Sequence, residues 1–313
     1  MSALIEVEVA QVRQLTPLVR EFTLVPRAGR LPRFSAGSHI QLQLPVGERL
    51  LRNCYSLTGD PARSDSYRIA VRLQEASRGG SRHLHESIGV GQRLRITPPA
   101  NLFALHSRAR LHILIAGGIG ITPFMAYVDE LEQRGAAFEL HYAFRTGLSD
   151  AYADALRQRL GTRFHPYDGG TGPALDLQAV LKGRPVGTHV YTCGPQGLIA
   201  DVRAQAQALG WADSCVHSEA FAAPEPGVAF SVELVRSQKR IEVAPGQSLL
   251  EALEDAGLDI PNMCRGGVCG QCATRHVGGE VEHRDSVLTA QERAHLLMPC
   301  VSRSCGTPVL LDL

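Results

Sequence analysis

Four cysteines in the last quarter of the chain have a spacing that can hold an iron–sulfur cluster. Four residues separate Cys264 from Cys269, two separate Cys269 from Cys272, and Cys300 follows after a further twenty-seven. Plant-type [2Fe–2S] clusters use this C-x4-C-x2-C…C pattern, with the thiolates as iron ligands. Glycines between the first three cysteines let the backbone pass close to the cluster sulfurs. The sequence therefore predicts a [2Fe–2S] cluster bound by these four residues.

Two other uses of four cysteines stay open. Structural zinc sites usually pair their cysteines in two short knuckles, whereas here one gap is longer and the last cysteine stands alone. Disulfides would be expected of a secreted protein, yet the first residues show neither a basic region nor an apolar stretch typical of a signal peptide. The other cysteines are scattered, which predicts reduced thiols and a cytoplasmic location; they are Cys54, Cys193, Cys215 and Cys305.

Composition sets the size and the class of the protein. The 313 residues are 44% hydrophobic and 20% charged, which is typical of a soluble protein with two or three domains. The net charge of +1, without a basic run, argues against a nucleic-acid partner. Glycines and a proline interrupt the longest apolar stretch, residues 111–128, so we expect no membrane span. A monomer is the default expectation.

Residues 1–104 show short strand-like patterns and two motifs that suit a cofactor. Hydrophobic and polar residues alternate over 5–9, 39–44 and 67–73, which predicts an antiparallel barrel or sandwich. Tyr55 offers an aromatic face on which a flat ring can stack. Glycines 79 and 80 precede Ser81 at the start of an expected helix, residues 81–87, where backbone N–H groups can hold a phosphate.

Residues 105–222 alternate between strands and helices, which predicts a doubly wound α/β domain. The apolar strand 111–116 runs into Gly117, Gly118 and Gly120, and a helix follows with Pro123 in its first turn. Glycines between a strand and a helix N-terminus let a pyrophosphate approach the backbone. Further strands are expected at 139–145 and 188–192, with helices at 123–134, 152–160 and 196–209.

The rest of the chain is expected to form a separate domain, residues 228–313, after a stiff linker rich in proline, residues 222–227. A hairpin is predicted over 229–235 and 239–243. A helix should then run from 249 to 256, with Ser248 as its N-cap and Gly257 at its end.

Taken in this order, the motifs resemble the phthalate dioxygenase reductase and vanillate demethylase reductase family, and the resemblance covers the whole chain. It implies a multidomain protein: an antiparallel flavin-binding β-barrel, a pyridine nucleotide domain and a C-terminal plant-type ferredoxin domain of the β-grasp type. It also implies FMN and NADH as cofactors beside the [2Fe–2S] cluster.

For the flavin, the resemblance implies that Tyr55 lies on the ring, Ser56 approaches N5 and the turn at Gly79, Gly80 and Ser81 holds the phosphate. Val71 and Arg72 lie between these two motifs. Asn53 stands where the family has a phosphate-binding arginine, so Arg52 is the candidate replacement.

For the nucleotide, the resemblance implies roles for residues of both glycine motifs. Thr122 would lie between flavin and nicotinamide, and Phe221 would cover the flavin face. Arg145 would meet the adenosine side, although a solvated loop arginine is nearly as good an interpretation. The Cys193-Gly194-Pro195 segment would lie beside the nicotinamide.

Electron counting gives the expected reaction. NADH releases two electrons as a hydride, a [2Fe–2S] cluster accepts one at a time, and a flavin can connect the two. The family resemblance implies a separate Rieske-type terminal oxygenase as acceptor, acting on an aromatic acid or a quaternary amine. Three alternatives remain: a reductase for a diiron monooxygenase, which usually has its ferredoxin domain first, a free flavin reductase, and an iron–sulfur redox sensor.

Overall fold

The computed structural model describes residues 4–47, 49–74, 79–221 and 227–313. Contacts divide the chain into two compact units with a boundary between Phe221 and Ala222. Arg78 of the phosphate turn and most of the expected linker, residues 222–226, lie outside the described residues.

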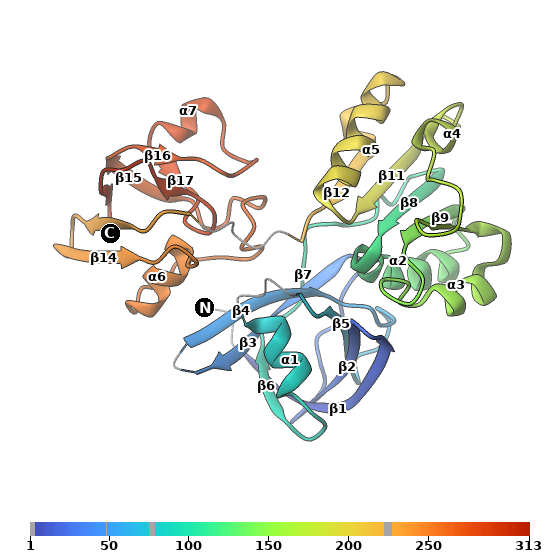
Figure 1. Cartoon of the computed structure of the whole chain (residues 1–313), viewed down its shortest axis with the longest axis horizontal. Helices are drawn as coiled ribbons and strands as arrows, with labels where there is room; N and C mark the ends of the chain where they lie inside the picture. Colours follow the sequence, from blue (N-terminus) through green and yellow to red (C-terminus); the bar gives the residue numbers. More distant parts are fainter. Residues whose placement is uncertain (1–3, 48, 75–78, 222–226) are drawn as a thin grey trace. The chain divides into compact units, whose positions relative to one another are not determined.

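The first part of the larger unit is an antiparallel sheet that closes on itself (Figure 1). Its order is β4-β3-β6-β1-β2-β5, and β7 pairs with β3. A bridge between Leu57 and Ile69 connects the chain after β4 to β5, which closes the barrel predicted from the sequence. The elements are β1 (Ile5–Thr16), β2 (Val19–Pro26), β3 (Ser38–Val46), β4 (Arg49–Ser56), β5 (Tyr67–Arg72), α1 (Gly80–Glu86), β6 (Arg93–Ile96) and β7 (Ala100–Asn101).

A parallel five-stranded sheet of order β10-β9-β8-β11-β12 follows in the same unit. This arrangement confirms the predicted α/β domain. The elements are β8 (Leu111–Gly117), α2 (Thr122–Gln133), β9 (Phe138–Phe144), α3 (Ala153–Leu160), β10 (Phe164–Asp168), α4 (Leu177–Leu181), β11 (Thr188–Cys193), α5 (Gln196–Ala208) and β12 (Val216–Glu219), with short 3-10 turns at Gly118–Ile121, Gly161–Arg163 and Asp213–Cys215.

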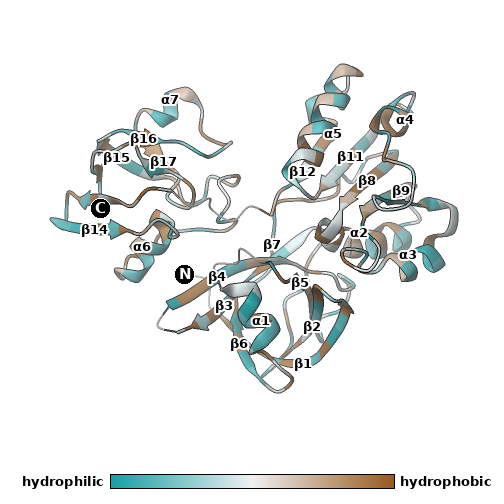
Figure 2. Ribbon diagram, viewed as in Figure 1, coloured by the Kyte–Doolittle hydropathy of each residue, from teal (hydrophilic) through white to brown (hydrophobic). Residues whose placement is uncertain are grey.

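Helices cover both faces of this sheet (Figure 1). Alternate residues of β8 point to opposite sides, so Leu114 packs with α2 and α3 while Ile113 packs with α4 and α5. The central strand β8 is mainly hydrophobic, as expected of a strand whose two faces are both buried (Figure 2). No helix of the described residues has the length and apolar character that a bilayer crossing needs.

The smaller unit is a mixed sheet of order β14-β13-β19-β15-β17 with one main helix, α6. Ser248 caps this helix through a capping box with Glu251, as the sequence predicted for the cap. β13 runs parallel to β19 and antiparallel to β14, which is the expected β-grasp arrangement. The elements are β13 (Phe230–Leu234), β14 (Lys239–Val243), α6 (Leu249–Asp255), β15 (Thr274–Gly278), β16 (Val281–Glu282), α7 (Ala290–Arg293), β17 (Leu296–Leu297), β18 (Arg303–Ser304) and β19 (Val309–Leu311).

Candidate functional site

The four predicted cluster cysteines come together in the smaller unit as two facing pairs. Sγ of Cys272 lies 3.4 Å from Sγ of Cys300. The Cys269 thiol donates to Cys264, and with the N–H of Gly266 this lowers the pKa of Cys264 to about 5. That N–H lies 3.4 Å from the Cys264 sulfur. Four converging thiols with backbone N–H donors fit a [2Fe–2S] cluster, whose potential such donors tune.

The loop that presents these thiols needs glycine at position 267. Its φ is +74°, and a methyl group there would lie 2.7 Å from Cγ2 of Val301 and 3.2 Å from Cα of Asp285. Any side chain would therefore push the loop away from the segment that carries Cys300.

A buried ion pair fastens the same loop to α6. Arg265 has a φ of +52°, which is uncommon for a residue other than glycine. Its guanidinium donates to both carboxylate oxygens of Glu254, at 2.9 and 2.7 Å. Both side chains are only 8% exposed. The sequence analysis missed this pair, because two charged residues eleven positions apart show no sign of contact before the loop is folded.

Several predicted flavin residues gather at one edge of the barrel. Asn53, on β4, donates to the hydroxyl of Tyr55 at 3.2 Å. A methyl group at Gly80 would lie only 2.2 Å from Nδ2 of Asn53, so the turn of Gly79, with its φ of +113°, sits directly against this strand. Asn53 therefore lies between Tyr55, the predicted flavin-ring contact, and the predicted phosphate turn. Burial raises the pKa of Tyr55 to about 12.

The remaining predicted flavin residues differ in exposure. Ser56 is buried at the end of β4, and Arg52 is half-buried two positions before Cys54. Val71 is buried and its carbonyl lies 2.8 Å from Nε2 of His85. Arg72 points outward at the end of β5, and Ser81 accepts from the backbone N–H of Gln74 at 3.3 Å.

The two predicted nucleotide motifs pack against one another. A methyl group at Gly120 would lie 2.1 Å from the carbonyl oxygen of Cys193, and one at Gly117 would lie 2.8 Å from Cδ of Pro195. A methyl group at Gly194 would likewise come into close contact with the backbone of Gly117. The glycines are thus required for close backbone contact between β8 and β11, at the carboxyl edge of the sheet where α/β folds bind nucleotides.

Other predicted nucleotide residues flank this contact. Thr122 is buried and its hydroxyl donates to the carbonyl of Ile119 at 3.0 Å. Gly118 has a φ of +54° at the start of the turn. Phe221 is 43% exposed, so its ring is available to a ligand. Arg145 is exposed after β9, and its backbone N–H donates to Ser149.

Glu219 is a buried carboxyl group at this edge that the sequence analysis missed. It pairs with Cys193 across β11 and β12. Burial raises its pKa to about 7. Its Oε2 and the hydroxyl of Thr192 are buried without a hydrogen-bond partner among the described residues. Such orphaned oxygens indicate a polar ligand, which fits the ring edges of a flavin or nicotinamide.

Replacing Glu219 by glutamine should stabilise the flavin-free protein at pH 8. The folded protein keeps this proton up to about pH 7, whereas the pKa of an ordinary glutamate is about 4.5. The stability due to the raised pKa is therefore complete below 4.5 and is lost as the pH rises through 7. We expect the free energy of unfolding of the variant to be about 3 kcal/mol larger than that of wild type at pH 8, and equal to it at pH 4.

The measurement is thermal unfolding at both pH values, with Glu86→Gln, an exposed position, as control. Equal pH dependence of Glu219→Gln and wild type would contradict a raised pKa.

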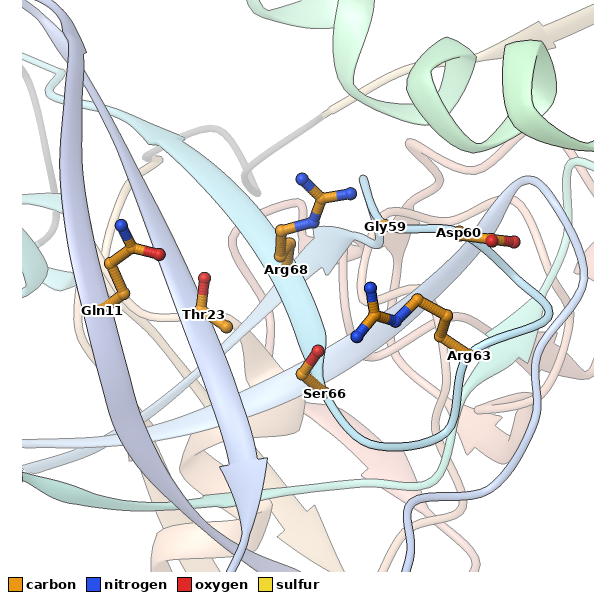
Figure 3. A pocket seen from close by; sticks show the side chains of 7 residues that line it. All are labelled: Gln11, Thr23, Gly59, Asp60, Arg63, Ser66 and Arg68. Atoms are coloured by element: carbon orange, nitrogen blue, oxygen red, sulfur yellow. The ribbon is translucent and has the colours of Figure 1, made fainter.

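A separate pocket of about 240 Å³ opens on the barrel (Figure 3). Arg63 at its rim is engaged with Asp65, through Nε to Oδ1 at 3.1 Å. None of its residues belongs to the predicted cofactor sites. It is lined by Gln11, Thr23, Gly59, Asp60, Arg63, Ser66 and Arg68.

Barrel, nucleotide domain and thiol cluster together define a ferredoxin reductase-type oxidoreductase. Comparison with known proteins agrees. Residues 232–309 match the 2Fe-2S iron-sulfur cluster binding domain family. Residues 92–216 match the N-terminal domain of dimethylamine monooxygenase subunit DmmA-like proteins.

Full-length relatives extend this result. The chain is 61% identical to the heme-dependent oxidative N-demethylase beta subunit of Ectopseudomonas mendocina, over 100% of both chains. It is 43% identical to the carnitine monooxygenase reductase subunit of Escherichia coli, over 98% of both. The structure of phthalate dioxygenase reductase superposes with a TM-score of 0.88 at 32% identity, over 99% of this chain and 98% of that one. The chain belongs to the phthalate dioxygenase reductase family of oxygenase reductases.

Family and fold together establish the general activity. The protein is an oxidoreductase of an oxygenase system that binds flavin and NAD(H) and carries a [2Fe–2S] cluster. The flavin, when bound, converts the two-electron donation of the nucleotide into the single electrons that the cluster accepts. The glycine turns and the four cysteines of this chain are the candidate sites for these groups.

Proposed function

We propose that the chain is the reductase component of an oxygenase that oxidises an amine, and that its partner is a haem-containing component. The observation that supports this partner is the 61% identity, over the whole chain, to the beta subunit of a heme-dependent oxidative N-demethylase. The match of residues 92–216 to a dimethylamine monooxygenase subunit and the 43% identity to a carnitine monooxygenase reductase favour the same substrate class.

A Rieske-type terminal oxygenase, as the sequence analysis expected, is the second candidate. It is supported by the superposition on phthalate dioxygenase reductase. Both candidates need a one-electron donor of low potential, about −400 mV for plant-type clusters, so this chain's chemistry is the same for either partner.

Residue roles form part of the proposal. FMN would be held by Tyr55 and Ser56, with its phosphate at the turn of Gly79, Gly80 and Ser81. Asn53 stands where the family has a phosphate-binding arginine, so Arg52 would be the phosphate partner. NADH would lie over the contact between the two glycine motifs, with Thr122 and Phe221 beside the rings. We also propose that the protein works as a monomer in the cytoplasm.

The test is reconstitution with two candidate oxygenase partners, one haem protein and one Rieske protein. The purified reductase should contain flavin and cluster in near one-to-one amounts, and both should bleach on anaerobic addition of NADH. We then expect rapid reoxidation by a haem protein, with NADH-dependent formaldehyde release from methylamines. Reoxidation by a Rieske protein alone would favour the second candidate, and failure with both would contradict the proposed function.

A further inference from the structure

Two histidines and a glutamate meet on β9 and the neighbouring edge strand β10 of the parallel sheet, away from the glycine motifs. Glu139 and His141 are two residues apart on β9, so they point to the same face. His165 lies opposite His141 in the register of β9 and β10. Each of the three offers a ligand atom, and these atoms lie within 4.8 Å of one another.

Two hydrogen-bonding contacts fix the orientation of the His141 imidazole ring, as in a side chain that coordinates a metal ion. Its Nε2 lies 3.3 Å from Oε2 of Glu139, while its Nδ1 lies 2.9 Å from the hydroxyl of Tyr167. A metal-binding imidazole usually donates its other ring N–H, so in the metal-bound form the Tyr167 hydroxyl would accept from Nδ1–H and Nε2 would face the ion. The other oxygen of Glu139, Oε1, accepts from Arg184 at 2.9 Å, so the carboxylate is held with Oε2 facing the imidazole.

The site is accessible and carries suitable charge. A cavity of about 360 Å³ opens over the three side chains, with Asp176 and Arg184 in its wall. Glu139 and Asp176 contribute two negative charges, Arg184 one positive charge, and neutral imidazoles none, so the site has an excess of one negative charge. The cavity leaves room for water to complete a coordination shell.

We propose that Glu139, His141 and His165 bind a divalent first-row transition metal ion, with zinc as the representative ion. Imidazole and carboxylate donors suit zinc, and three protein ligands with an open position are a common zinc arrangement. His165 lies on an edge strand and is half-buried, which lets its ring turn toward the ion. Arg145, the predicted adenosine contact, follows the end of β9 four residues after His141, about 13 Å along the chain, so the site is distinct from the predicted nucleotide contact.

The bound ion would connect β10 to β9. β10 is short, lies at the edge of the sheet and contains Pro166, which cannot donate a hydrogen bond to the ladder. A metal between His141 and His165 would add a cross-strand connection where the ladder is weakest. We therefore expect zinc to raise the thermal midpoint of the protein.

The experiment measures zinc binding to the holoprotein with its cluster intact. After chelator treatment and equilibrium dialysis against zinc chloride, metal analysis should give one zinc per chain, and iron analysis should show that the cysteines still hold their cluster. His165→Gln and Glu139→Gln should each weaken zinc binding more than about tenfold, and Tyr167→Phe should weaken it about tenfold through loss of orientation.

The matched control is His106→Gln, an exposed histidine of the same domain that stacks on His189 instead. It should bind zinc as wild type does. The proposal is overturned if wild type binds no zinc, if the His165 and Glu139 variants bind as well as wild type, or if the control loses the ion. The first outcome would mean that Glu139, His141 and His165 form a hydrogen-bonded network and no metal site.

Discussion

Replacing Cys269 by serine should abolish NADH-driven reduction of cytochrome c while leaving the flavin in place. A serine hydroxyl is a poor substitute for thiolate at iron, and the cluster needs all four ligands. Cys269 also donates to Cys264, so both members of one facing pair are disturbed. The barrel and nucleotide domain form a separate compact unit, so flavin and nucleotide binding should survive.

The measurement compares two acceptors. Cytochrome c, which receives electrons through the cluster, should be reduced at the background rate, whereas a small dye that reacts with the flavin should be reduced as fast as by wild type. Iron analysis should confirm loss of the cluster. Cys305→Ser is the matched control, because this thiol is exposed and is not one of the four. A Cys269→Ser protein that still reduces cytochrome c would identify a free flavin reductase.

Local sequence rules were sufficient for the elements whose signals are local. The apolar run of β8 and its glycine turn, the capping box of α6 and the spacing of the cysteines all lie within a few residues of one another. The comparisons support the fold and the cofactors that these signals predicted. The individual flavin and nucleotide contacts remain predictions.

What the sequence analysis missed depends on distant parts of the chain. It did not anticipate β10, because Pro166 argues against a strand unless the strand lies at a sheet edge, and strand order is known only from the fold. Glu219 gained its raised pKa from burial beside Cys193, a pairing between separate strands. Likewise, the departure at Asn53 became interpretable only when its contact with Gly80 was seen.

Retention of the [2Fe–2S] cluster should depend strongly on the ion pair of Arg265 and Glu254, which holds the cluster loop against α6. Replacing Arg265 by methionine removes the cation beside the buried carboxylate of Glu254 and leaves the amide of Asn262 as a donor to it. Loss of one partner from a buried ion pair typically costs about 3–5 kcal/mol. The loop holds Cys264 next to this arginine, so loss of the pair should release the cluster. We expect the variant to lose its visible cluster absorption at a lower urea concentration than wild type, with flavin content unchanged.

A double variant separates charge from packing. Arg265→Met combined with Glu254→Leu removes both charges and keeps apolar volume, so it should recover most of the lost resistance to urea. The control is Arg236→Met, which breaks an ion pair with Asp312 whose arginine side chain is 71% exposed, and it should behave as wild type. If the single and double variants lose the cluster equally, the arginine acts through its shape and hydrogen bonds to the loop. Recovery in the double variant would show that the buried carboxylate, deprived of its cation, is what opens the loop.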